Sequence, residues 1–147
     1  MSRNRFYIVL VEDAEPDVIL VREALEQSGL EFDLRVFDDG EQGVDFVENM
    51  DRDASVTRPH LFLLDLNLPK KDGREVLEEI KESDALKSIP VVILTTSASD
   101  ADVLRSYKLH ANCYITKPVG LDGFLNVVKS IDSFWLSVVR LPHEARS

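Results

Sequence analysis

One segment sets the architecture that we expect of this chain: His60-Leu61-Phe62-Leu63-Leu64-Asp65-Leu66-Asn67-Leu68-Pro69-Lys70-Lys71-Asp72-Gly73. Four large apolar residues run directly into the carboxylate of Asp65, and a proline and an Asp-Gly turn follow. This pattern is typical of a β-strand that is buried on both faces and ends at a site. A buried carboxylate without a partner is costly, so we expect Asp65 to lie at the open end of the strand or to have a cation beside it. Taken alone, the segment is also explained by a turn-forming Asp that caps a strand.

Composition favours one acidic domain without a membrane segment. The chain has 147 residues, of which 44% are hydrophobic, and no apolar run approaches the ~20 residues that a membrane helix needs. Residues 1–5 lead into the first expected strand without an apolar signal region, which predicts a cytoplasmic location. The net charge of −10 repels polyanions, and Lys70-Lys71 is the one basic cluster in the sequence, so nucleic-acid binding is disfavoured.

Cysteine and histidine give no sign of a metal cage. Cys113 is the single cysteine, so no intramolecular disulfide can form, and a small buried residue is a better explanation for it than a nucleophile. The three histidines, His60, His110 and His143, are far apart in the sequence and form no ligand pair at helical spacing. A zinc site is therefore disfavoured.

Hydrophobic periodicity predicts five strands that alternate with helices. The expected strands are Phe6–Val11, Leu34–Phe37, Leu61–Leu64, Ile89–Leu94 and about Asn112–Thr116. The expected helices are Pro16 to about Ser28, a short one around Val44–Val47, one capped by Asp72 that ends near Ser83, Ser99–Leu109, and one from Leu121 onward. The polar, aperiodic stretch Asn49–Pro59 predicts a long loop. Such alternation is typical of an α/β fold with a parallel sheet and helices on both faces.

Polar residues follow the carboxyl ends of four of these strands, where parallel sheets bind ligands. They are Glu12 and Asp13, Asp65, Thr95 and Lys117. Each has a simpler explanation when taken singly: acids at a helix start, a turn hydroxyl, a solvated lysine. Four strand ends with complementary chemistry are better explained by one site.

The chemistry of these residue types suits phosphoryl transfer. Converging carboxylates repel one another unless a divalent cation neutralises them. Mg²⁺ takes oxygen ligands, so two carboxylates and a backbone carbonyl near Asn67 would suffice, and Glu12 could hold a coordinated water. A lysine opposite the metal would balance a phosphoryl charge, and a threonine hydroxyl could bind one phosphoryl oxygen. One carboxylate would then be free to act as the nucleophile.

With these residues in place, the chain resembles the receiver domains of two-component response regulators. The resemblance rests on Val9-Leu10-Val11-Glu12-Asp13, Leu64-Asp65-Leu66-Asn67-Leu68-Pro69 with Asp72-Gly73, Leu94-Thr95-Thr96 and Thr116-Lys117-Pro118. It covers nearly the whole sequence. It implies the flavodoxin-like (βα)5 fold, a five-stranded parallel sheet in strand order 2-1-3-4-5, and a cis peptide bond before Pro118.

The resemblance also implies a role for each site residue. Asp65 would be the phosphoacceptor of a His-to-Asp phosphorelay. The implied Mg²⁺ ligands, with Mn²⁺ as a substitute, are Asp13, Asp65, the backbone carbonyl of Asn67 and, through water, Glu12. The implied switch and phosphate-binding residues are Thr95, Tyr114 and Lys117. The chain would not be an enzyme, beyond Mg²⁺-dependent self-phosphorylation and slow autodephosphorylation.

A narrower resemblance points to small regulators partnered with bacterial phytochromes. It rests on Leu66–Leu77, on the long loop before His60 and on Ser133-Phe134-Trp135-Leu136, and it implies a phytochrome-like sensor histidine kinase as partner. Two residues depart from the commoner receiver pattern. Lys71 replaces a frequent apolar residue, which would alter kinase contact. Thr96 replaces a smaller residue beside the acyl phosphate, which would restrict entry of the hydrolytic water or of a phosphatase and slow dephosphorylation.

An apolar stripe runs from Leu121 to Val139, past the length expected of a receiver's last helix. If Leu121–Arg140 is fully helical it spans about 30 Å, more than a small sheet covers, so we expect a homodimer through this region. The residues expected at the dimer or partner surface are Phe134, Trp135, Val138 and Val139. The alternative is that Trp135 and Val139 fold back onto their own domain.

The domain expected is a single receiver over residues 1–147, with a core of about 6–132 and an extension and tail of about 133–147. The short segment from Leu141 leaves no room for an output domain, so the expected output is a contact with another protein, or a phosphate passed onward, rather than DNA binding.

Three other functions fit the sequence less well than a receiver does. A metal-dependent phosphatase with an aspartate nucleophile would need a second acid two residues after Asp65, where this chain has Asn67. A flavodoxin-like cofactor binder would need a phosphate-cradling loop in place of Glu12-Asp13. A receiver that acts only as a scaffold would not need the complete residue set.

Overall fold

A computed structural model of the chain describes residues 5–66, 68–95 and 113–134. Five parallel strands form one sheet in the order β2-β1-β3-β4-β5, which confirms the predicted strand order. The strands are β1 (Phe6–Val11), β2 (Phe32–Phe37), β3 (Leu61–Leu64), β4 (Val91–Thr95) and β5 (Cys113–Thr116). The helices are α1 (Glu15–Gln27), α2 (Gly40–Arg52), α3 (Gly73–Glu82) and α5 (Gly120–Phe134).

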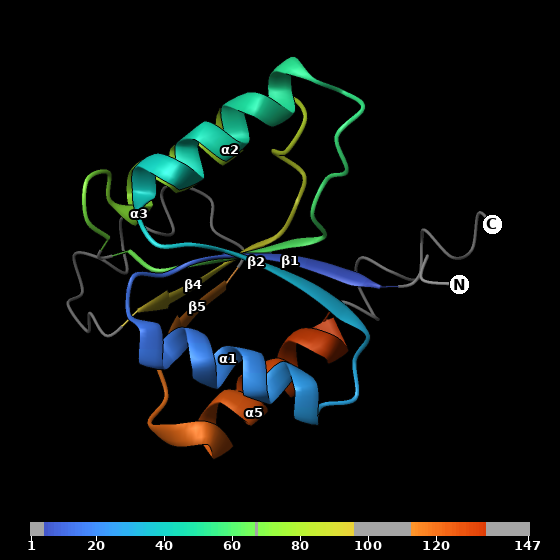
Figure 1. The fold of residues 1–147 in the computed structure, drawn as a ribbon, viewed down its shortest axis with the longest axis vertical. Helices are drawn as coiled ribbons and strands as arrows, with labels where there is room; N and C mark the ends of the chain where they lie inside the picture. Colours follow the sequence, from blue (N-terminus) through green and yellow to red (C-terminus); the bar gives the residue numbers. More distant parts are fainter. Residues whose placement is uncertain (1–4, 67, 96–112, 135–147) are drawn as a thin grey trace.

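The helices cover the two faces of the sheet in pairs. Figure 1 shows α2 and α3 above the sheet and α1 and α5 below it, and the members of each pair pack along each other. Because successive strand residues point to opposite faces, β1 supplies both sides: Val9 and Val11 join the cluster under α2 and α3, and Ile8 and Leu10 join the cluster over α1 and α5. Both faces of the sheet are therefore shielded from solvent, which is why these strands are continuously apolar.

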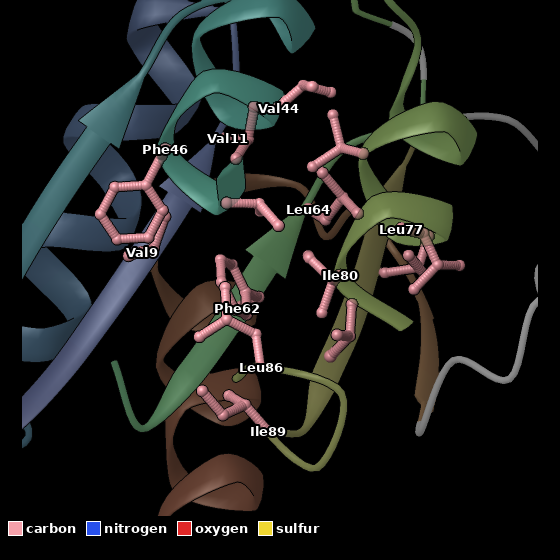
Figure 2. Packing of buried hydrophobic residues seen from close by; sticks show 14 of the residues in the cluster. Val9, Val11, Val44, Phe46, Phe62, Leu64, Leu77, Ile80, Leu86 and Ile89 are labelled. Carbon is pink, nitrogen blue, oxygen red and sulfur yellow. The ribbon is translucent and has the colours of Figure 1, made fainter. Parts of the chain in front are cut away.

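The α2/α3 face shows how much apolar surface the sheet buries. Figure 2 shows side chains of β1 and β3 meeting those of the two helices, with Phe62 and Leu64 of β3 close to Ile80 of α3. Phe62, Leu64 and Ile80 are at most 1% exposed. Each such side chain stabilises the fold by about 1.5–3 kcal/mol relative to an exposed one.

Helix α3 begins where the sequence predicted and for the predicted reason. The Asp72 carboxylate accepts a hydrogen bond from the backbone N–H of Glu75, and the Glu75 side chain accepts one from the backbone N–H of Asp72, so that the two residues form a capping box. Val76, Leu77 and Ile80 form its buried face. The helix ends at Glu82, in agreement with the expected end near Ser83.

The prediction of a short helix followed by a loop from Asn49 was wrong. Helix α2 runs from Gly40 to Arg52, and the loop begins at Asp53. The cause is amphipathicity: Met50 is 3% exposed and continues the buried face, while its polar neighbours lie on the solvent side and resemble a loop in the sequence. The Asp39 carboxylate caps the start of the helix by accepting a hydrogen bond from Gln42 N–H at 2.8 Å.

The peptide bond before Pro118 differs from the expectation. The peptide bond before Pro118 is trans, and no bond between described residues is cis, so the cis expectation was wrong; trans is the ordinary state, favoured by about 0.5–1 kcal/mol at X-Pro bonds. The expected helix over Ser99–Leu109 and the part of the C-terminal helix after Phe134 lie outside the described residues. Within the described part of the chain, no helix is long and apolar enough to cross a membrane.

Candidate functional site

The strand register brings the acidic strand ends together. Val11 of β1 pairs with Leu64 of β3, so the residues that follow them, Glu12 and Asp65, leave the sheet side by side. Backbone hydrogen bonds continue one step beyond the strands: Asp65 N–H donates to the carbonyl of Val11 at 3.0 Å, and Glu12 N–H donates to that of Phe37 at 2.9 Å. The sheet itself therefore fixes the backbone at both acids.

Three carboxylates meet at this edge. Glu12, Asp13 and Asp65 each offer one oxygen, and these oxygens lie within 4.8 Å of one another. Glu12 and Asp65 are 3% and 5% exposed, whereas Asp13 is exposed. The set contains only hard oxygen donors, and it faces solvent on the side of Asp13. It fits a divalent cation, because hard oxygen donors are the ligands that such ions prefer.

The side chain of Lys117 lies against the same carboxylates. It follows β5, is 7% exposed, and places its Nζ 2.7 Å from Glu12 Oε1, 3.1 Å from Asp65 Oδ2 and 2.8 Å from Asp17 Oδ2. Burial alone lowers the pKa of Lys117, but the hydrogen bonds to Asp17 and Glu12 and the charge of Asp65 outweigh it and raise the pKa above its ordinary value. Lys117 is therefore a permanent cation in this crevice.

At Glu12, the surroundings favour the uncharged form of the side chain, whereas at Lys117 they favour the charged form. Burial of its carboxylate and, to a smaller extent, the nearby charge of Asp65 raise its pKa against the lowering effect of Lys117, and the balance of these effects is a pKa of about 7. The backbone N–H of Ala14 donates to Glu12 Oε2 at 3.1 Å and offsets a part of this cost. A cation that neutralised the crevice would favour the ionised form of Glu12.

The structure describes some of the remaining predicted site residues and not others. Thr95 is the last residue of β4 and pairs with Thr116, so its backbone lies at the same edge of the sheet as the acids. Tyr114 is half-buried on β5 and packs against the α2/α3 cluster. The expected site residues Asn67, Thr96, Trp135, Val138 and Val139, and the side chains of Thr95 and Phe134, lie outside the description.

Sequence reasoning missed one member of the crevice, Asp17. It lies in the first turn of α1, and its carboxylate receives a hydrogen bond from Lys117 Nζ. The available signal was the position of that turn, because a helix that follows β1 starts at the same edge as the site. Glu15 and Asp17 both lie in that turn, and the spacing of the residues does not choose between them.

The loop after Asp65 is held from both neighbouring helices. At the start of α3, Gly73 N–H donates to the carbonyl of Leu66 at 2.8 Å, and a Cβ on Gly73 would lie 2.0 Å from the carbonyl oxygen of Asp65. At the start of α2, Lys70 Nζ lies 3.5 Å from the carboxylate of Asp39. The Asp-Gly pair of the opening segment therefore allows α3 to approach the backbone of Asp65, and a side chain at Gly73 would block it.

A parallel 2-1-3-4-5 sheet with a buried lysine among acids at its carboxyl edge is the architecture of response regulator receivers. The profile of the response regulator receiver domain matches residues 8–129, and the chain belongs to this family.

Named relatives agree with this assignment. The chain is 50% identical over 135 residues to the response regulator Rcp1 of Synechocystis sp., covering 92% of each chain. The crystal structure of the phosphorylated cyanobacterial phytochrome response regulator RcpA superposes with a TM-score of 0.82 at 47% identity, covering 92% of this chain and 96% of that one. The Mn²⁺-bound form of Rcp1 gives a TM-score of 0.79 at 48% identity, covering 91% and 96%.

Proposed function

We propose that this protein is a phosphoacceptor response regulator of a His-to-Asp phosphorelay, with Asp65 as the residue that receives the phosphoryl group. The observation that carries the proposal is the contact at the end of β3: the buried Asp65 Oδ2 lies 3.1 Å from Lys117 Nζ and beside the oxygens of Glu12 and Asp13. A nucleophilic carboxylate with a fixed cation on one side and further acids on the other is arranged for phosphoryl transfer.

The residues present would hold a divalent cation, Mg²⁺ with Mn²⁺ as a substitute. Asp13, Asp65 and the backbone carbonyl of Asn67 would bind it directly, and Glu12 would bind it through water. Support comes from the oxygen-only donor set and from the Mn²⁺-bound structure of Rcp1. The cation would neutralise the acids and the incoming phosphoryl oxygens.

The chain's own residues then perform the transfer. An oxygen of Asp65 attacks the phosphorus of the donor, so an Asp–O–P bond forms while the bond between phosphorus and the donor nitrogen or oxygen breaks. Lys117 donates hydrogen bonds to the phosphoryl oxygens that Asp65 gains. Thr95 and Tyr114 would convey the change away from the site. The modified chain is itself the product, so the protein is a signalling switch rather than a turnover enzyme.

The partner that we propose is a sensor histidine kinase of the phytochrome type. Support comes from the likeness to Rcp1 and to the phytochrome response regulator RcpA, each covered over more than nine-tenths of its length. The output would be contacts with other proteins, without nucleic acid or membrane. These contacts would include a homodimer through the region of Phe134, Trp135, Val138 and Val139.

The test is intact mass after incubation with acetyl phosphate. Wild-type protein with Mg²⁺ should gain one phosphoryl group, and it should gain none without the metal. Asp65→Asn should gain none under either condition, whereas Asp45→Asn, at an exposed position of α2, should behave like wild type. A phosphorylated phytochrome histidine kinase serves as the second donor.

Two outcomes would contradict the proposal. One is an adduct that persists in Asp65→Asn. The other is sustained hydrolysis of a small phosphate ester, which would instead indicate an aspartate-nucleophile phosphatase.

A further inference from the structure

We propose that Asp17 is a positioning residue that sets the affinity of the site for its divalent cation by sharing Lys117 with Glu12 and Asp65. The inference rests on the proposed function, because it concerns the cation that the three acids would hold. It goes beyond that function by assigning a role to a residue outside the acid cluster.

The ammonium group of Lys117 contacts three carboxylates at once. An ammonium has three N–H donors, and Lys117 Nζ has three carboxylates within 3.1 Å, from Glu12, Asp17 and Asp65. The lysine side chain is 7% exposed, so water is a poor substitute for a carboxylate that is lost. Asp17 is the most exposed of the three acids, at 27%, and approaches from α1 rather than from the sheet.

Lys117 and a bound cation compete for the same acids. The two buried carboxylates that Lys117 contacts, Glu12 and Asp65, also belong to the group whose oxygens could hold a metal ion; Asp17 does not belong to it. An ammonium that is free to concentrate on Glu12 and Asp65 neutralises them and lowers their attraction for a cation. Asp17 draws part of the ammonium's hydrogen bonding toward α1 and leaves the acids more negative.

A cation that binds also leaves Lys117 with one undisturbed partner. With a cation held by Asp65 directly and by Glu12 through water, the hydrogen bond to Asp17 Oδ2, which is 2.8 Å long in this structure, would keep Nζ close to Asp65. The backbone of Asp17 is itself fixed, since its N–H donates to the carbonyl of Ala14 at 3.0 Å. Lys117, with a flexible four-carbon stem, would otherwise have no rigid anchor on that side.

The chain supplies a matched control for charge. Glu15 lies on the same helical turn, is exposed, and forms no ion pair among the described residues. Glu15→Gln and Asp17→Asn remove the same charge from the same turn, so they change the interaction with the helix dipole alike. Only the second removes a carboxylate from Lys117.

The experiment is calorimetric titration of MgCl₂ into metal-free wild type, Asp17→Asn, Asp17→Glu, Glu15→Gln, Lys117→Met and the Asp17→Asn/Lys117→Met double variant. We expect Asp17→Asn to raise the dissociation constant about fivefold, and Asp17→Glu and Glu15→Gln to leave it within about twofold. In the Lys117→Met background, Asp17→Asn should have no more effect than Glu15→Gln has in wild type, because the residue acts through the lysine.

Three results would overturn the inference. Equal dissociation constants for Asp17→Asn and Glu15→Gln would show that the contact with Lys117 is immaterial. An effect of Asp17→Asn that persists undiminished in Lys117→Met would show that Asp17 acts by its charge alone. Failure of wild type to bind Mg²⁺ would refute the cation site of the proposed function together with this inference, which separates it from the first two results.

Discussion

At the scale of residues, burial of the Glu12 and Asp65 carboxylates destabilises the folded protein unless a cation compensates for it. Both carboxylates are almost completely buried, and they lie close enough to repel each other, so each depends on Lys117 for compensation. Breaking a buried ion pair by removing one partner typically destabilises a protein by about 3–5 kcal/mol, because the other charge stays behind. Without a metal ion, Lys117 therefore stabilises the crevice by neutralising its buried acids.

The raised pKa of Glu12 predicts a loss of stability with pH in the metal-free protein. Below its ordinary pKa of 4.5, Glu12 is protonated in both the folded and the unfolded chain; between there and about 7, the unfolded chain releases the proton and the folded chain keeps it. Stability is therefore fully present below 4.5 and falls as the pH rises to about 7. We expect a loss on the order of 2 kcal/mol in wild type after allowance for solvent screening, and a clearly smaller one in Glu12→Gln, where Glu79, whose pKa burial also raises, still contributes.

Urea unfolding in EDTA at pH 5 and pH 7.5 measures this difference. Glu23→Gln, at an exposed position of α1, is the control and should follow wild type. The acids whose pKa is lowered, such as Asp33 and Asp39, titrate below this window and do not contribute to the change. Equal pH dependence in wild type and Glu12→Gln would contradict the assignment of the loss to Glu12.

The sequence predicted those site residues that the sheet itself aligns. Glu12, Asp65 and Lys117 each follow an apolar strand directly, and parallel strands end at one edge, so the juxtaposition follows from topology. Asp17 could not be predicted in the same way. Its position depends on which side of α1 faces the crevice, and the packing of α1 against α5 decides that rotation.

At the scale of elements, Gly73 controls how closely α3 approaches the end of β3. A Cβ at this position would lie 2.0 Å from the carbonyl oxygen of Asp65 and 2.6 Å from Leu66 Cα, which are backbone atoms that cannot move aside. We predict that Gly73→Ala lowers the free energy of unfolding by about 3 kcal/mol or more, and that it weakens Mg²⁺ binding because Asp65 shifts.

Gly43 is the matched control for Gly73→Ala. It lies inside α2, and its nearest neighbour is the side-chain Cγ1 of Val76 at 3.3 Å, which can yield. Alanine also favours a helix over glycine by about 1 kcal/mol, so Gly43→Ala should change stability by less than about 1 kcal/mol. Guanidinium unfolding and calorimetry measure both variants. Similar, small losses in the two would show that the close approach at Gly73 is not needed.

Element boundaries show where hydrophobic periodicity stops being informative. Helix α3 was predicted correctly because its cap, Asp72, and its buried residues agree. The end of α2 was missed because the segment from Asn49 to Arg52 has a single buried residue, Met50, among exposed polar ones. One apolar residue in four does not distinguish the last turn of an amphipathic helix from a loop, and only packing against the sheet reveals its role.

At the scale of the whole molecule, the dimer proposal has a direct test. The apolar stripe in the sequence includes Trp135, and large aromatic residues often dominate interfaces, so Trp135→Ala should raise the dimer dissociation constant at least about tenfold. Lys129→Ala, an exposed position of α5, should leave it unchanged. Sedimentation velocity over a concentration series measures both. Identical dissociation constants with and without a phosphate mimic would rule out coupling between phosphorylation and dimerisation.

The acids at the strand ends have a consequence for folding as well. Strands β1 and β3 are apolar on both faces, so a slip of one residue would exchange one apolar lining for another, and hydrophobicity alone would oppose it weakly. Such a slip of β3 would place Asp65 opposite Val11, in the position that Leu64 occupies, and would draw its carboxylate into the core away from Lys117. The energetic cost of that burial penalises the misaligned pairing. The carboxylate of Asp65 thus helps to select the correct register between β1 and β3 during folding, before any cation or phosphate binds.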